Sequence, residues 1–455
     1  MDKVKFWITL GALFLWGCMN PLNAWGNNAL SDKQAIIDFL NLRYGMFIHY
    51  NMGTYHQEQW AYPFHDPKSF KPTHLDCKQW AKAAKSAGMK YAVLTAKHHD
   101  GFCLWNTTTS AYDIASSDYK TDIVRQYVDA FRAENIKIGL YFSVMDWHQD
   151  INKGNINTEN IAFMKKQLTE LLTNYGEIIC IIIDGWGSKW GGPTFEELPF
   201  DTLADHIHSI QPKCLVINHS CNTSLSQTEV VHYEATHGQH CPYDNVIPSQ
   251  QGPTLQQAWF WEPGFEKDPL KPVDVVIKEL NFANSHYSNY LLNVAPNDKG
   301  LLDENVIKQL AEIGKLVYLP DKDLEELPEL RKVQMNVTVV ASSEESSKYG
   351  ASNVVDANLH TQWKFDKNDP EKWIELDFSR PETFNKVICG EFYQDIRKFK
   401  IEAFVKGKWT EIVKGGKMGV NFHASFPDVK AQKYRLTVIE YDNSPLLSEI
   451  TFVKY

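Results

Sequence analysis

The feature that most constrains the fold is a regular alternation of short apolar runs and amphipathic stretches between Tyr44 and Leu319. Apolar, β-branched runs are typical of strands buried on both faces, and apolar residues at helical spacing between them predict helices. The predicted strands are Gly45–Tyr50, Lys90–Lys97, Lys137–Val144, Ile178–Asp184, Cys214–His219, Val230–Glu234, Gln256–Trp261 and Tyr290–Val294. The predicted helices are Cys77–Ala87, Asp122–Glu134, Thr158–Tyr175, Asp201–Ile210, Val273–Asn284 and Glu304–Leu316. Strands and helices alternating over roughly 250 residues predict an α/β fold, a (β/α)8-like TIM-type barrel, with irregular long loops over residues 222–254.

The pattern changes after Leu319. Residues 320–334 are charged and polar and predict a linker. Residues 335–455 contain short runs of alternating apolar and polar residues and no long helical pattern, which predicts an all-β sandwich. Its predicted strands are Asn336–Ala341, Lys372–Phe378, Lys386–Glu391, Lys398–Phe404 and Lys433–Glu440.

The first 24 residues have the layout of a secretory signal peptide. A basic start is followed by an apolar run from Phe6 to Trp16, which is shorter than the ~20 residues that span a bilayer. Two cleavage sites fit the sequence. Leu15-Trp16-Gly17-Cys18 resembles a lipoprotein signal ending before Cys18, and Leu22-Asn23-Ala24 suits ordinary signal-peptide cleavage. We therefore expect an exported protein, either periplasmic or tethered to the outer membrane through a lipid on Cys18, with the barrel occupying residues 25–319.

Composition narrows the class of partner. The formal net charge of −10 argues against a nucleic-acid partner, because phosphate recognition needs clustered Lys and Arg. The high aromatic content, 13%, suits sugars, whose C–H faces stack on aromatic rings. The eight cysteines show no paired metal-binding spacing.

Polar and aromatic side chains collect where the predicted strands end, which is where barrel enzymes carry their catalytic groups. They are His49, His98, His99, Trp105, Tyr141, Trp147, Asp184, His219, Glu234 and Trp259. Together they predict a lined pocket, although a lone histidine in such a place is more often a core residue with satisfied hydrogen bonds. Because neighbouring strand residues point to opposite faces, we expect no metal at His98 and His99.

The fourth predicted strand ends in Asp184-Gly185-Trp186. Gly185 permits a sharp exit from the strand, and Trp186 provides an apolar wall beside the carboxylate or belongs to the core. Asp184 taken alone fits a helix cap equally well. Asp184 and Glu234 together form a pair of carboxylates at a sugar-shaped pocket, which is the equipment of glycoside hydrolysis. The sequence contains neither a phosphate-binding glycine loop nor a Gly-x-Ser-x-Gly nucleophile elbow.

Four segments carry a specific resemblance: Tyr44-Gly45-Met46-Phe47-Ile48-His49, the stretch from Ala96 to Trp105, Ile183-Asp184-Gly185, and the stretch from Asn289 to Val294. Over residues 40–318 the chain resembles the α-L-fucosidases of glycoside hydrolase family 29. The resemblance implies an irregular (β/α) barrel that needs no cofactor and removes terminal α-L-fucose from oligosaccharides or glycoconjugates with retention of configuration. It further implies that Asp184 is the nucleophile and that His49, His98 and His99 bind fucose, with Trp147 and Trp259 in segments that line the pocket.

The position of the acid/base follows less directly from the resemblance, because Glu229 and Glu234 both lie at a suitable distance along the chain. We prefer Glu234, since the strand Val230–Tyr233 would carry it to the mouth of the barrel, whereas Glu229 would begin that strand. Gln59-Trp60 stands where many relatives have Glu-Trp, which makes Trp60 a candidate sugar contact and leaves the outer contacts open.

The sequence also bears on the preferred glycosidic linkage and leaves two rival activities open. Leu75-Asp76-Cys77 and the histidine-rich stretch resemble the subgroup that prefers α-1,3/1,4-linked fucose. A non-catalytic, lectin-like fucose-binding protein is one rival, and a hydrolase of α-L-galactosides is another. The retention of both carboxylates argues against the lectin.

The C-terminal region resembles a discoidin-type sandwich through Asp356-Ala357-Asn358, Thr361-Gln362-Trp363 and Trp373-Ile374-Glu375-Leu376. Such modules bind carbohydrate at their loop ends and hold a structural calcium in some cases. A module that only packs against the barrel is an equally good interpretation, and we expect Trp363 to lie in its core.

Overall fold

The computed structural model describes residues 32–186, 190–219, 228–242, 245, 247–320, 322–327, 337–355, 361–392, 395–419, 422–443 and 445–454. The predicted signal peptide 1–24, the lipid site at Cys18, most of the predicted linker and the motif Asp356-Ala357-Asn358 lie outside these residues. Within them, no helix is long and apolar enough to cross a membrane.

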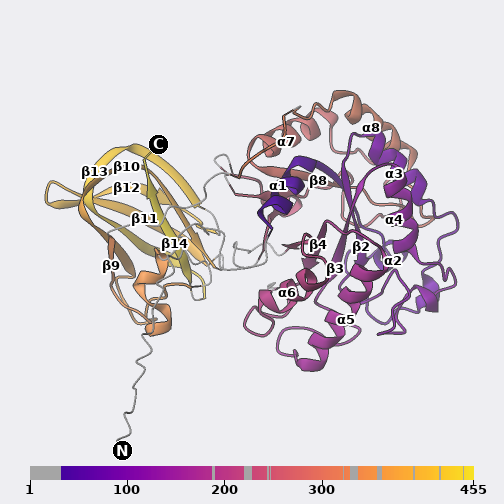
Figure 1. Cartoon of the computed structure of the whole chain (residues 1–455), viewed down its shortest axis with the longest axis horizontal. Helices are drawn as coiled ribbons and strands as arrows, with labels where there is room; N and C mark the ends of the chain where they lie inside the picture. Colours follow the sequence, from indigo (N-terminus) through magenta and orange to yellow (C-terminus); the bar gives the residue numbers. More distant parts are fainter. Residues whose placement is uncertain are drawn as a thin grey trace, which may run out of the picture.

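The first part of the chain folds into an eight-stranded parallel sheet wrapped into a nearly closed barrel, which confirms the predicted fold class (Figure 1). Its strands are β1 (Tyr44–Ile48), β2 (Tyr91–Lys97), β3 (Lys137–Ser143), β4 (Cys180–Asp184), β5 (Leu215–Asn218), β6 (Val231–Tyr233), β7 (Ser249–Gln251) and β8 (Ser288–Asn293). The order across the sheet is β5-β4-β3-β2-β1-β8-β7-β6. Strands β1 and β2 are buried along their whole length, as expected for a sheet covered on both faces.

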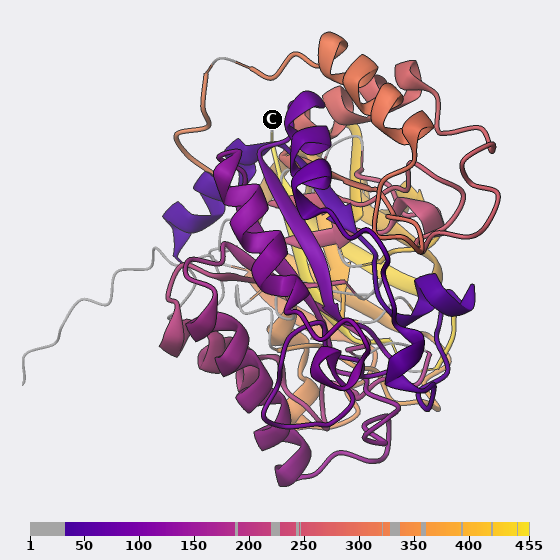
Figure 2. The same ribbon diagram turned by 90° about the vertical axis from the view of Figure 1, so that its right-hand side faces the viewer.

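Helices precede or follow these strands, and most of them run along the outside of the barrel (Figure 2). They are α1 (Lys33–Leu42), α2 (Met52–His56), α3 (Cys77–Ser86), α4 (Ile123–Ala133), α5 (Thr158–Asn174), α6 (Phe200–Ile210), α7 (Val273–Ser285) and α8 (Glu304–Leu316). Six of them match the predicted helices within about two residues. Acidic or amide side chains cap the amino ends of several of these helices. Asp76 accepts from two backbone N–H groups of α3, and Asn157 with Asn160 forms a capping box on α5.

The seventh strand is not where the sequence predicted it. The run Gln256–Trp261 is a loop at the barrel mouth, and β7 is the polar segment Ser249–Gln251. Its glutamines are buried because side-chain hydrogen bonds satisfy them: Gln250 accepts from Tyr91 and donates to His232 Nδ1 at 2.8 Å. Hydrophobic periodicity cannot detect a strand whose side chains are polar and internally paired.

The strands β5 and β6 form the two ends of the sheet, and Glu229 bridges the gap between them. The Val216 N–H donates to Glu229 Oε2 at 2.6 Å, and the Glu229 N–H donates to Val216 O at 3.1 Å. His208 Nε2 of α6 lies 3.2 Å from the same carboxylate oxygen. This buried carboxylate replaces a backbone acceptor and closes the barrel near the amino ends of its strands.

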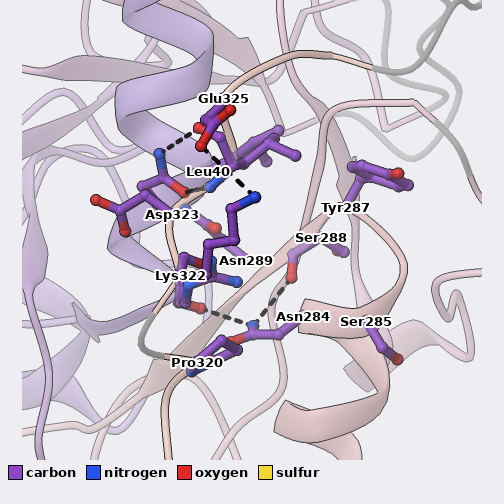
Figure 3. A pocket seen from close by; sticks show the side chains of 13 residues that line it. Leu40, Asn284, Ser285, Tyr287, Ser288, Asn289, Pro320, Lys322, Asp323 and Glu325 are labelled. Carbon is purple, nitrogen blue, oxygen red and sulfur yellow. Dashed lines mark hydrogen bonds and ion pairs between the residues drawn. The ribbon is translucent and has the colours of Figure 1, made fainter.

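At the amino ends of the strands, α1 and residues 322–327 cover the barrel. The Asn41 side chain pairs with the backbone of Leu324 in both directions, at 2.7 and 3.0 Å. Leu324 and Leu327 pack into the hydrophobic cluster of α1 and the inner barrel. A cavity of about 400 Å³ lies beside this contact, between Leu40, Asn284, Ser288, Pro320 and residues 322–325 (Figure 3). The first residues of the predicted linker are therefore part of the barrel's base.

The C-terminal region is an antiparallel β-domain enclosing its own hydrophobic core. Its strands are β9 (Val337–Ala341), β10 (Trp373–Glu391), β11 (Ile396–Val405), β12 (Lys408–Gly415), β13 (Phe422–Tyr441) and β14 (Leu447–Val453). The predicted strands Lys372–Phe378 and Lys386–Glu391 are the two halves of β10, which is interrupted by register shifts. Strands β12 and β14 were not predicted. Trp363 is buried in this core, as expected.

Candidate active site

Asp184 is the centre of a group of polar and aromatic side chains at the carboxyl ends of the barrel strands. Its Oδ2 accepts from the Tyr141 hydroxyl at 2.7 Å and lies 3.3 Å from His219 Nδ1 and 3.6 Å from His99 Nε2. Gly185 follows with φ +76°, and a Cβ there would lie 2.7 Å from the Cβ of Met145. Only glycine therefore fits the exit from the strand.

The surroundings of Asp184 favour its ionised form. Burial by itself would raise its pKa, but the charges of His219 and His99 and the hydrogen bonds from His219 and Tyr141 hold the pKa well below its ordinary value. Burial would lower the pKa of His219, but the Asp184 carboxylate raises it above its ordinary value. The pair therefore favours a carboxylate beside an imidazolium, which leaves Asp184 unprotonated and able to act as a nucleophile.

His49 is held in place by Asn293, which lies in the stretch from Asn289 to Val294 but had no predicted role. Asn293 Nδ2 donates to the Trp259 carbonyl at 2.9 Å, so its Oδ1 accepts from His49 Nδ1 at 2.7 Å. Burial lowers the pKa of His49 to about 3, which keeps the ring neutral. With the proton on Nδ1, His49 has an acceptor lone pair on Nε2, suited to a sugar hydroxyl. The Trp259 ring packs 4.9 Å from the His49 ring.

His98 and His99 lie side by side, with ring centroids 4.3 Å apart. The expectation that they face opposite sides is wrong, because β2 ends at Lys97 and the two histidines lie in the turn that follows. Ser143 donates to the Met145 carbonyl at 2.6 Å, and its oxygen accepts from His99 Nδ1 at 2.7 Å. Burial lowers the pKa of both histidines, and the charge of Asp184 only partly offsets this effect.

No group of three or more His, Cys, Asp or Glu side chains in the described part of the chain is arranged to hold a metal ion.

The predicted aromatic residues divide into two sets. Trp60 and Trp147 lie at the mouth: the Trp60 ring is 5.0 Å from His99 and 5.4 Å from Trp147. Trp105 and Trp186 do not line the pocket. Both are fully buried in the hydrophobic core, where Trp105 Nε1 donates to Glu170 at 2.8 Å and Trp186 Nε1 donates to Leu198 O at 2.7 Å. Their position beside polar strand ends suggested a pocket wall, but their indole N–H groups are satisfied within the protein.

Glu234 and Glu229 lie at opposite ends of β6. Glu234 follows the strand, is buried, and lies 2.6 Å from His237 Nδ1. Its charge favours protonation of His99 and His219, the same histidines on which Asp184 acts. Glu229 precedes the strand and closes the gap between β5 and β6. Glu234 therefore lies at the same end of the barrel as Asp184, and Glu229 at the opposite end.

Two further residues of the site escaped a specific assignment from sequence. His219 was noted only as a strand end, although it is the residue that pairs with Asp184. His232 lies on β6 with its ring 4.3 Å from that of His219, and burial holds its pKa well below the ordinary value. The strand-end position was a usable signal for His219. His232 gave none, because only the closure of the barrel brings it beside the site.

With this geometry established, comparisons with known proteins identify the family. A family model described as alpha-L-fucosidase matches residues 9–320. The chain belongs to the alpha-L-fucosidase family. It is a glycoside hydrolase of the fucosidase class, and such enzymes act on fucosylated glycans. The C-terminal domain matches the F5/8 type C model over residues 338–450, which confirms the discoidin-like resemblance.

The relatives of this fucosidase share moderate sequence identity. The alpha-L-fucosidase 1 of Arabidopsis thaliana is 29% identical over 440 residues, covering 89% of this chain and 83% of that protein. The tissue alpha-L-fucosidase of Bos taurus is 29% identical over 256 residues, covering 52% of each chain. The solved structure of alpha-L-fucosidase isoenzyme 1 from Paenibacillus thiaminolyticus has a TM-score of 0.54 at 23% identity, covering 90% of this chain and 99% of that one, which shows a shared fold.

Proposed function

We propose that this fucosidase is an exo-acting enzyme that hydrolyses terminal α-L-fucosides with retention of configuration. Asp184 attacks the anomeric carbon and forms a fucosyl-enzyme ester. Glu234 first protonates the leaving oxygen and then deprotonates the water that cleaves the ester. The observation that carries the proposal is the geometry at Asp184, which accepts a hydrogen bond from Tyr141 and lies 3.3 Å from His219 Nδ1 at the carboxyl end of β4.

His49 supports the binding of a sugar. Its Nδ1 proton is engaged by Asn293 Oδ1, so its Nε2 is an acceptor for a fucose hydroxyl. Trp259 and Trp60 supply aromatic faces for the apolar side of the ring. A preference for α-1,3/1,4 linkages belongs to the proposal as well, as does export, either to the periplasm or to the outer membrane through a lipid on Cys18. A digestion panel of linkage-defined fucosides and the Cys18→Ala variant test these two points.

The decisive experiment separates the two carboxylates. Glu234→Ala should lower the rate on natural fucosides by about 10²- to 10⁴-fold, the usual contribution of general acid catalysis. The loss should be smaller for formation of the fucosyl-enzyme from an aryl fucoside with a good leaving group, which needs no proton. Asp184→Gly should impair every substrate, whatever its leaving group.

Added azide then reports the stereochemistry. In the Glu234→Ala variant, azide should attack the fucosyl-enzyme and give the α-azide after two inversions. Any product from Asp184→Gly should be the β-azide after a single inversion. An α-azide from the Asp184 variant, or failure of mass spectrometry to detect a fucosyl-enzyme in the Glu234 variant, would refute the retaining mechanism with Asp184 as nucleophile.

A further inference from the structure

A buried ion pair lies against the turn that carries His98 and His99. Lys97 ends β2 with none of its side chain exposed, and its Nζ donates to Asp146 Oδ2 at 3.0 Å. Asp146 follows β3 and its side chain is 1% exposed. Replacing a buried ion pair by apolar side chains of similar volume is often neutral or stabilising, so stability is not the best explanation of this pair.

Both members of the pair are fixed by further contacts. The Lys97 Nζ also donates to Gln167 Oε1 of α5 at 3.0 Å, and it lies 4.2 Å from the centre of the Phe142 ring. The second carboxylate oxygen of Asp146 accepts from the Gln149 backbone N–H at 3.0 Å. Each charge therefore has a defined orientation, which a buried pair needs if its attraction is to offset the loss of hydration.

The carboxylate of Asp146 contacts the turn directly. Gly101 has φ +92°, and a Cβ on it would lie 2.3 Å from Asp146 Oδ1, so the backbone of the turn packs on this oxygen. The next residue, Trp147, donates its backbone N–H to the His99 carbonyl at 2.9 Å. The chain enters the same turn at Lys97, where β2 ends. The ion pair therefore joins the two segments that meet at this turn.

The position of the turn decides where two predicted fucose-binding groups lie. His99 Nε2 is 3.6 Å from Asp184 Oδ2, and the His98 and His99 rings are 4.3 Å apart. The His99 ring is oriented by Ser143, whose oxygen accepts from its Nδ1 at 2.7 Å. That contact does not fix the backbone of the turn, whose position depends on the ion pair. A misplacement of about 1 Å in such a group can cost about 10²-fold in rate.

We propose that Lys97 and Asp146 are positioning residues for fucose binding, because their ion pair holds the His98–His99 turn in place beside Asp184. Both side chains are buried, so they act through the turn and not by contact with the sugar. The inference rests on the proposed function in one respect, that these histidines bind the fucose ring. It does not depend on retention of configuration, so the azide experiment and the test of this pair can fail separately.

The test removes the pair without leaving a buried charge unpaired. In Lys97→Met/Asp146→Asn both charges are lost, and the asparagine keeps an oxygen for the Gln149 N–H. The KM for p-nitrophenyl α-L-fucoside should rise on the order of 10-fold, because the displaced turn weakens binding of the fucose ring. A pair that served only stability would lower the active fraction, so that kcat falls at an unchanged KM. That result, or no change in either constant, overturns the proposal.

A double-mutant cycle with His99→Ala gives an independent measurement. If the pair acts through the turn, its removal should cost less once the positioned ring is absent. The loss of kcat/KM caused by Lys97→Met/Asp146→Asn should therefore be at least about 3-fold smaller in the His99→Ala background than in the wild-type background. Equal losses in the two backgrounds overturn the proposal.

Glu229→Gln is the matched control, because it removes the charge from another buried pair, at the opposite end of the barrel. It should lower the melting temperature and leave KM unchanged. Asp146→Asn alone keeps the shape of the side chain and should raise KM in the same direction, so the test does not depend on the folding of the double variant. Wild-type protein that hydrolyses no aryl fucoside refutes the proposed function and the positioning role with it, whereas hydrolysis with an unchanged KM in the pair variants refutes the positioning role alone.

Discussion

Glu229 and Glu234 lie five positions apart in sequence, and the structure predicts opposite consequences for their removal. Glu229→Ala should destabilise the barrel and leave the chemistry of the folded enzyme largely intact. Glu234→Ala should reduce activity and leave the melting temperature nearly unchanged. The difference follows from position, because Glu229 closes the β5–β6 gap and Glu234 lies at the same end of the barrel as Asp184.

The size of the stability loss follows from the contacts of Glu229. Its removal leaves the Val216 N–H and the His208 imidazole buried without an acceptor. Breaking a buried pair by removing one partner costs about 3–5 kcal/mol. At roughly 2–4 °C per kcal/mol for domains of 150–250 residues, the expected fall in melting temperature is on the order of 10 °C.

The same pair predicts a pH dependence of stability. Burial would lower the pKa of His208, but the hydrogen bond to Glu229 and its charge raise the pKa above the ordinary value. A raised folded-state pKa means that the pair stabilises fully below the unfolded pKa of about 6.5, and that this contribution is lost as pH rises through the folded pKa. Glu229→Gln retains an acceptor for Val216 but no charge, so this part of the pH dependence should disappear.

Differential scanning calorimetry across pH 5–9 measures the predicted loss of stability. Measurement of kcat/KM below the melting temperature tests the predicted effects on activity. Glu229→Gln is the matched control, with a smaller loss of stability than Glu229→Ala. Should Glu229→Ala instead show the dependence on leaving group expected for Glu234→Ala, while remaining as stable as wild type, the positions assigned to the two carboxylates would be wrong.

Two more predictions follow from the site and from the base of the barrel. His219→Gln removes the cation that lowers the pKa of Asp184, so the acid limb of the plot of kcat/KM against pH should move to higher pH. An unchanged acid limb would mean that other groups keep the pKa of Asp184 low. A chain ending at Leu319 should melt several degrees below one ending at Leu327. Leu324 and Leu327 pack in the cluster with α1, and each contributes up to about 1.5–3 kcal/mol to the free energy of unfolding. Equal melting temperatures would show that residues 322–327 do not stabilise the barrel.

Hydrophobic pattern predicted most of the barrel because most of its strands and helices are defined by what they bury. The strands that carry His49, His98, Asp184 and Glu234 were recognised as apolar runs with a polar end, and the barrel places such ends on one face. The hydrophobic pattern did not predict β7, because the glutamines of this strand are buried through hydrogen bonds. It also failed at Trp105, whose burial depends on Glu170 from a distant helix.

By itself the sequence determined the alternation of strands and helices except at β7, the change to a β-domain, and the carboxylate and histidines at strand ends, because these depend on local periodicity. Only the tertiary structure decided which of these side chains meet. His219 pairs with Asp184, Asn293 orients His49, and Glu229 closes the sheet far from the pocket. Each of these is a contact between residues distant along the chain, and such contacts exist only once the barrel has closed, so no local pattern encodes them.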